Sequence, residues 1–150
     1  MNRLPFATLL SALFALAGCS PPTRWDEVAR ATSPDGRLDA VLAESNGGAT
    51  TTFVYHVHVV AAGAAVHGDP VAELVGATRN RQAYGASLAW TSPRRLEIRY
   101  LDAYTTRRDA AGVTAVGAGF DLAFAPGRTD PGAPPGGMRH NIERAKADAR

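Results

Sequence analysis

Apolar and polar residues alternate along several short segments of this chain, and a period of two predicts β-strands. The densest segment covers residues 50–60, where β-branched and aromatic residues dominate. Further alternating segments are 28–32, 37–44, 88–90, 96–100 and 116–124, with a weaker one at 71–75. We therefore expect an all-β fold of five to six strands, either one small antiparallel sheet or a two-layer sandwich. A helical turn over 25–30 is an alternative that the pattern leaves open.

Turn-forming residues separate these segments. Ser33-Pro34-Asp35-Gly36 combines a proline that presets φ, an aspartate that can bond its own backbone and a glycine that accepts positive φ. Thr91-Ser92-Pro93-Arg94 stands between 88–90 and 96–100. Both stretches predict β-hairpins. The polar residues 102–112 are expected to form a loop or an exposed strand end.

The N-terminus carries a different pattern. Arg3 precedes an apolar run from Leu4 to Ala17, and the only cysteine, Cys19, follows Gly18. The run is shorter than the roughly 20 residues that span a bilayer, and a basic start with small residues before a cleavage point indicates a signal peptide. Its ending, Leu16-Ala17-Gly18-Cys19, resembles the lipobox of bacterial lipoproteins. That resemblance implies transfer of a diacylglyceryl group to the Cys19 thiol, cleavage before Cys19 and acylation of the new N-terminus, with palmitate among the fatty acids. It also implies an envelope location facing the periplasm, with the outer membrane favoured over the inner.

These patterns divide the chain into four parts. We predict a signal peptide over 1–18, a lipid-anchored tether over 19–24, a β-domain over 25–125 and a Pro/Gly-rich tail over 126–150 that contains a short helix. The 16 basic and 14 acidic residues nearly cancel and are dispersed, which argues against nucleic acid as a partner. Because Cys19 is the only cysteine, the domain must fold without a disulfide.

Several stretches together resemble an uncharacterised family of small bacterial envelope proteins and lipoproteins that carry an SPDG turn followed by a GATT segment. They are Ser33 to Arg37, Glu44 to Thr52, Gly76 to Asn80, Ala83 to Gly85 and Leu88 to Tyr100. The resemblance covers residues 26–124 and implies a fold and a location, but no activity. Many members have a cysteine where this chain has Gly47, so a thiol or disulfide role at that position does not carry over.

Two histidines are the sharpest chemical feature. His56 and His58 stand two residues apart in the 50–60 segment, so their side chains point to one face of the predicted strand. Strand-borne zinc and copper sites use this spacing, with a third ligand from elsewhere, such as His67, Asp69 or Glu44. The alternative is a solvent-facing pair of imidazoles opposite a core face. Beyond this zinc or copper hypothesis we predict no cofactor.

Other candidate residues are fewer. Arg79, Arg81 and Tyr84 form a polar and aromatic patch that suits a carboxylate or phosphate. We find no nucleophile motif and no paired carboxylates that would indicate an enzyme. The sequence therefore favours a non-enzymatic binding module, held at the membrane by a lipid anchor, that binds an envelope protein, a peptidoglycan-associated component or a small ligand. A metal-binding lipoprotein using His56 and His58 is the alternative. A small hydrolase with no identifiable catalytic residues is a weaker option.

Overall fold

The computed structural model describes residues 25–130 apart from 49 and 81. This part of the chain forms eight strands and one helix, α1 (Ala110–Val116). The strands are β1 (Trp25–Thr32), β2 (Leu38–Ser45), β3 (Val54–Ala61), β4 (Ala72–Val75), β5 (Ala86–Ser92), β6 (Arg95–Tyr100), β7 (Thr105–Arg108) and β8 (Asp121–Ala125). The all-β prediction is therefore confirmed, although eight strands replace the five to six that were expected.

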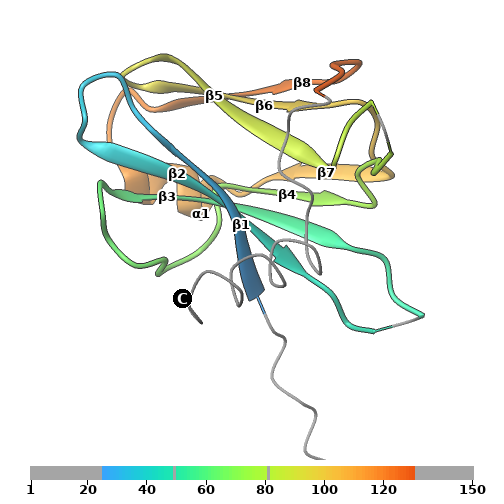
Figure 1. Ribbon diagram of the computed structural model, residues 1–150. Coiled ribbons are helices and arrows are strands. Elements are labelled where there is room, and N and C mark those ends of the chain that lie inside the picture. Colours follow the sequence, from blue (N-terminus) through green and yellow to red (C-terminus); the bar gives the residue numbers. More distant parts are fainter. Residues whose placement is uncertain (1–24, 49, 81, 131–150) are drawn as a thin grey trace, which may run out of the picture.

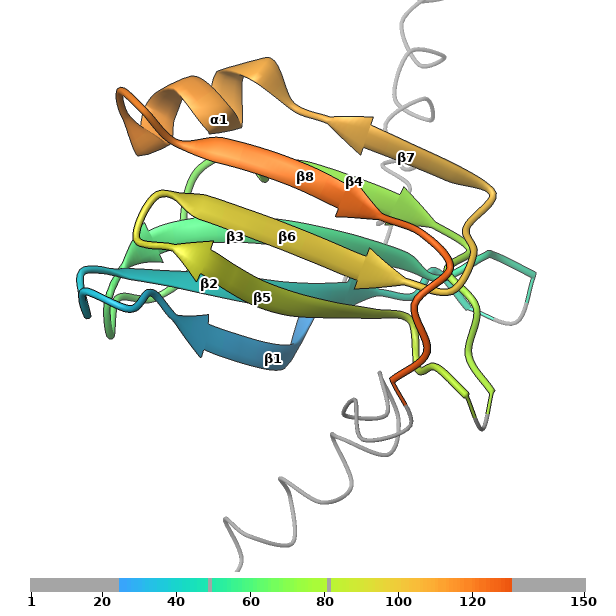
Figure 2. The ribbon, with the colours of Figure 1, turned by 90° about the horizontal axis from the view of Figure 1, so that it is seen from above.

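The strands form two stacked sheets (Figure 1). The larger sheet has the order β1-β2-β3-β4-β7 and is antiparallel throughout. The smaller sheet has the order β5-β6-β8, and its β6–β8 pair is parallel. Parallel neighbours need a crossover, which β7 and α1 supply (Figure 2). The architecture is a two-layer sandwich with one parallel pair.

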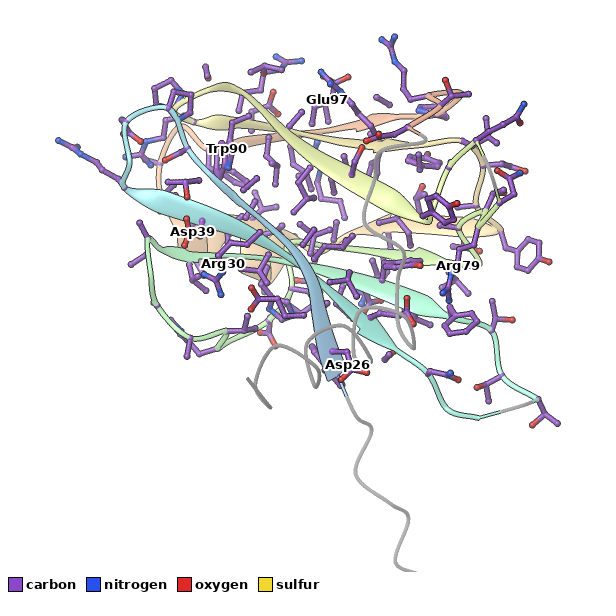
Figure 3. The ribbon with its side chains drawn as sticks, in the orientation of Figure 1. Asp26, Arg30, Asp39, Arg79, Trp90 and Glu97 are labelled. Carbon is purple, nitrogen blue, oxygen red and sulfur yellow. The ribbon has the colours of Figure 1, made fainter. Side chains whose placement is uncertain are left out.

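The hydrophobic core fills the space between the sheets. Leu42, Tyr55 and Leu74 contribute from the larger sheet, and Leu96, Ile98 and Leu122 contribute from the smaller one; all six are at most 1% exposed. Trp90 on β5 reaches across the layers, because its Nε1–H donates to the carbonyl of Ala31 on β1 at 2.8 Å (Figure 3). Most alternating segments thus place their apolar faces as their period predicts. The 116–124 segment is an exception, because Val116 ends α1 and β8 begins only at Asp121.

Both predicted hairpins are present. In the first, the Gly36 N–H donates to the Ser33 carbonyl at 2.8 Å and Gly36 has φ of 71°, a conformation that glycine accepts without strain. The Ser33 hydroxyl donates to Asp35 and accepts from the Leu38 N–H. This turn joins β1 and β2, and the Thr91–Arg94 turn connects β5 and β6.

Three sequence expectations were wrong in detail. The 25–30 alternative is not a helical turn, because this stretch pairs with β2 as a strand. Residues 102–112 include the exposed strand β7, as one of the two expectations had it, but they also include the unexpected start of α1. There the Asp109 carboxylate accepts hydrogen bonds from the first-turn N–H groups of Ala111 and Gly112. His56 and His58 do not face solvent, since they are only 9% and 1% exposed. The short helix predicted in the tail lies outside the described residues.

Candidate functional site

The candidate site lies on the outer face of the larger sheet, opposite the core. Strand register places the side chains of His56 on β3, Glu73 on β4 and Arg107 on β7 side by side on this face. Ser45, near the end of β2, lies diagonally beside His56 on the same face. Trp25, the first residue of β1, pairs with Ser45. Four consecutive strands and the more distant β7 thus bring one aromatic and four polar side chains together.

Polar contacts connect these side chains in a row. Ser45 Oγ lies 3.1 Å from His56 Nε2, and His56 Nδ1 lies 3.2 Å from Glu73 Oε1. Arg107 Nη2 donates to Glu73 Oε2 at 2.7 Å. The indole of Trp25 stacks on the His56 imidazole, with ring centroids 4.3 Å apart and an interplanar angle of 12°. The imidazole of His56 is therefore fixed by contacts at both ring nitrogens and on one ring face.

His58 is held differently. Its side chain is 1% exposed, and neither ring nitrogen has a hydrogen-bond partner among the described residues. The Trp25 ring lies against it in a tilted arrangement, with centroids 5.4 Å apart. A buried polar ring without partners costs free energy, because it has lost its hydrogen bonds to water. Burial of the His58 ring therefore costs more free energy than burial of His56, the other histidine of this pair.

Burial determines the charge state of both rings. Burial lowers the pKa of His56, although the Glu73 carboxylate acts in the opposite direction. Burial also lowers the pKa of His58, and the neighbouring His56 adds to this effect. Both imidazoles are therefore neutral at neutral pH.

The order Ser45, His56, Glu73 is the order of a nucleophile, a general base and an orienting acid. Such a nucleophile needs an open approach for its substrate. Ser45 is only 7% exposed, and the Trp25 indole covers one face of the base. We therefore interpret the row as a polar support for Trp25, in which Ser45 bonds one ring nitrogen of His56 and the Glu73 carboxylate lies near the other. The non-enzymatic expectation stays a prediction.

The zinc or copper hypothesis gains no third ligand from the structure. Within residues 25–130, apart from 49 and 81, no group of three or more His, Cys, Asp or Glu side chains has the arrangement of a metal site. In addition, the Ser45 hydroxyl and the Glu73 carboxylate already contact the two ring nitrogens of His56. Metal binding by His56 and His58 stays a prediction without support from this geometry.

A second polar cluster lies at one end of the core. Glu44 is 2% exposed and sits beside Tyr55 in the β2–β3 register. Burial raises the pKa of the Glu44 carboxyl, and the Arg79 guanidinium, 3.6 Å away, opposes this rise. Burial likewise raises the pKa of the Tyr55 phenol. Arg79 also lies over the Phe53 ring at 4.1 Å from its centroid.

The predicted patch of Arg79, Arg81 and Tyr84 is thus only partly assembled. The Arg79 side chain, labelled in Figure 3, contacts Glu44 and the Phe53 ring. Tyr84 meets Arg79 through an isolated backbone bridge, and Arg81 lies outside the described residues. Arg79 therefore takes part in an internal ion pair, which the sequence did not indicate.

Two surface hollows are of interest: the first borders Arg79, and the second lies beside the smaller sheet. One, of about 390 Å³, is lined by Phe53, Thr78, Arg79 and Tyr104 among others. The other, of about 440 Å³, is lined by Ser87, Arg99, Arg128, Thr129 and Asp130, and we call it the two-arginine hollow. Its side chains are polar, and two guanidinium groups suit a carboxylate or a phosphate.

The chain has no match among protein families, curated proteins or solved structures. The resemblance to the SPDG and GATT family therefore stays a prediction. Cys19 lies outside the described residues. Within those residues, the structure contains no helix with the length and apolar character needed to cross a bilayer.

Sequence reasoning missed Ser45, Glu73 and Trp25 as neighbours of the histidines. Alternation did place the two histidines on one face of their strand, but the 37–44 segment was expected to end before Ser45, which the structure places in β2. It could not give the β3–β4 pairing, because β4 is only four residues long and its alternation is weak. The register between β3 and β4 is the information that the sequence pattern did not supply.

Proposed function

We propose that this chain is a lipid-anchored module of the bacterial envelope that binds a partner through its β-domain. The observation that carries the proposal is the position of Cys19, directly after an apolar run and a small residue. The first strand begins at Trp25, only six residues later. A folded domain that starts so close to an acylated cysteine suits a membrane-bound module.

The short connection limits where the domain works. Six residues span at most about 20 Å when fully extended. An acyl chain holds a protein at a bilayer by about 0.8 kcal/mol for each buried CH₂, so two or three chains anchor it stably. The domain then stays beside the membrane surface, and its partner must come to it.

The two-arginine hollow is the best candidate for the binding surface. Arg99 lies on β6, and Arg128 follows β8, so two elements of the smaller sheet supply its cations. Arg99 already pairs with Glu97 at 3.1 Å, which shows that a carboxylate fits beside it. An envelope protein or a peptidoglycan-associated component that presents carboxylates matches this chemistry.

The anchor is tested by Cys19→Ser, with Ser20→Ala as the matched control. In cells supplied with labelled palmitate, we expect the parent and Ser20→Ala proteins to be cleaved, labelled and recovered with membranes. The Cys19→Ser protein should remain an unlabelled precursor. Equal processing and membrane recovery of all three proteins would exclude lipidation at Cys19.

The binding surface is tested by site-specific photo-crosslinking in intact cells. A photoreactive residue at Thr129, in the two-arginine hollow, should form a discrete adduct. The same residue at Thr91, exposed on β5, is the control and should form none. The adduct at Thr129 should be lost when Arg99 and Arg128 are both changed to Gln. An adduct that persists in this double variant would contradict the proposed surface.

A further inference from the structure

Two exposed large hydrophobic side chains, Trp25 and Tyr104, share one end of the larger sheet. They are 44% and 81% exposed, and no other large hydrophobic side chain in the described part of the chain is comparably exposed. The last register row of the sheet runs from Trp25 through Ser45, Val54 and Val75 to Thr105, the neighbour of Tyr104. The two aromatic residues therefore occupy opposite edges of the same end.

Both rings are held in place by the fold. Trp25 stacks on His56, as described above. The Tyr104 N–H donates to the Val75 carbonyl at 2.9 Å, and its ring lies so close to Gly76 that a Cβ there would collide with it. Gly76 also has φ of 65°, so glycine is required at this position on two grounds. The Tyr104 side chain is therefore held in a defined position at this end of the sheet.

The proposed anchor connects at this same end, because β1 begins at Trp25. We propose that this end of the domain lies on the lipid surface, with the Trp25 and Tyr104 rings at the level of the headgroups. The inference rests on the proposed lipidation of Cys19. Tryptophan and tyrosine are the residues enriched at membrane interfaces, since each combines an apolar ring with a polar group. Four strand spacings of about 4.8 Å separate the edges, so two contacts roughly 19 Å apart would fix the tilt of the domain.

The opposite end has the character expected of a surface that faces away from lipid. It carries the turns at Ser33–Gly36 and Thr91–Arg94, and it exposes Asp35, Arg37 and Arg94. The Arg37 side chain is 82% exposed. Charged, fully hydrated groups of this kind lose hydration free energy at a bilayer. The end with Trp25 and Tyr104 also exposes Asp102, so among the described residues the two ends differ mainly in the exposed aromatic rings that only the first end carries.

Tryptophan fluorescence tests the orientation in the full acylated protein. The protein is reconstituted into phosphatidylcholine vesicles, part of whose lipid carries bromine on the acyl chains near the headgroup. Trp90→Phe leaves Trp25 as the only tryptophan, and Trp25→Phe leaves Trp90. We expect brominated lipid to cause a loss of Trp25 emission and to leave Trp90 emission nearly unchanged. Equal quenching of the two tryptophans, or none of either, would overturn the proposed orientation.

A second variant and a second measurement guard against misfolding. Tyr104→Ser, made in the Trp90→Phe protein, should weaken the quenching of Trp25, whereas Arg94→Ser at the opposite end should not change it. In the protein without substitutions, hydrogen exchange at residues 101–105 should slow on vesicles relative to a Cys19→Ser protein made without residues 1–18, which is the mature chain with no acyl group. Exchange at the 33–36 turn should be the same in both. Uniform slowing, or none, would contradict docking by this end.

These outcomes separate the orientation from the anchor. Mass spectrometry of the purified protein shows whether Cys19 is acylated. If it is acylated and sediments with vesicles while Trp25 is not quenched, the anchor stands and the orientation fails. If no acyl group is present, the proposed function fails at its first step, and the orientation fails with it.

Discussion

Asp39 and Glu44 are two buried carboxylates on one strand, and their pKa values shift in opposite directions. Asp39 is 3% exposed on the outer face of β2, and Glu44 is 2% exposed on its core face. The Gly63 N–H, the Thr32 hydroxyl and Arg30 all donate to Asp39, and these hydrogen bonds lower its pKa (Figure 3). Glu44 has no comparable set of donors, and burial raises its pKa. Hydrogen bonding, more than depth, decides the charge of each group.

Relative to the parent protein, the Glu44→Gln variant should gain stability as the pH rises. A carboxyl whose pKa is raised on folding binds protons more tightly in the folded state, so its contribution to stability is largest below pH 4.5 and declines as the pH rises through the folded pKa. Glutamine keeps the shape and does not titrate. The free energy of unfolding of Glu44→Gln, relative to the parent, should therefore increase between pH 5 and pH 8 in urea titrations. A constant difference would show that Glu44 is not perturbed by burial.

Asp39→Asn should show the reverse dependence and serves as the matched comparison. The lowered pKa means that the ionised form stabilises the fold above pH 3.8 and that this contribution is lost as the pH falls. At pH 7 the substitution should cost about 2 kcal/mol, since it removes charge-assisted hydrogen bonds from Arg30 and Gly63. Urea titrations at pH 7 and pH 3 should show that the cost shrinks in acid. An equal loss of stability at pH 7 and pH 3 would show that the cost of Asp39→Asn comes from packing alone.

His58→Leu should make the protein less sensitive to mild acid. The pKa of His58 is lowered on folding, so the unfolded chain binds the proton more tightly, and stability falls as the pH drops below about 6.5 toward the folded pKa. Leucine fills a similar volume and brings no unpartnered ring nitrogens. Unfolding at pH 7.5 and pH 5 should show a smaller loss in the variant than in the parent. His67, at an exposed loop position, adds only the smallest of the effects that lower the His58 pKa, so His67→Ala should keep most of the parental loss.

Gly85→Ala should be far more damaging than Gly36→Ala. Both glycines have positive φ, 85° and 71°, so each substitution costs about 1–2 kcal/mol in backbone strain. At Gly36 the new methyl group meets nothing within 4 Å, whereas at Gly85 it meets the buried ring and hydroxyl of Tyr55. Overpacking adds about 1–3 kcal/mol at Gly85. Thermal unfolding of the two variants measures this difference, and similar melting temperatures would contradict the close contact with Tyr55.

Alternation and turn chemistry predicted the fold class because both are local. The β1–β2 and β5–β6 hairpins join neighbouring segments, so Ser33–Gly36 and Thr91–Arg94 were sufficient to pair them. The parallel β6–β8 pair is not local, and no short segment encodes it. The seven residues of α1 are too few to show a helical period, and its position depends on the Asp109 cap and on Gly112 packed against Pro70.

The outer-face cluster was harder to predict, for a related reason. Period two correctly placed His56 and His58 on one face, but it could not show that Trp25 would cover them. The partner of His56 comes from β4, a strand of four residues whose register depends on its neighbours β3 and β7. Arg79 was predicted as a surface group, yet its contact with Glu44 depends on how the chain after β4 folds back. Long-range contacts set the chemistry of both sites.

Trp90→Ala should lower the stability of the protein, because the indole connects the two sheets. The Trp90 ring meets Phe120 edge-on with centroids 6.2 Å apart, and its Nε1–H bonds to Ala31 in the opposite sheet. Since the ring is half-buried, we expect a loss of about 3 kcal/mol, at the lower end for tryptophan-to-alanine changes. Trp90→Phe keeps an aromatic ring and removes the hydrogen bond, so it should cost about 1 kcal/mol. Urea unfolding of both variants measures the cost of losing the whole indole and the cost of losing its hydrogen bond alone. If Trp90→Ala were near neutral, the indole would not be part of the contact between the layers.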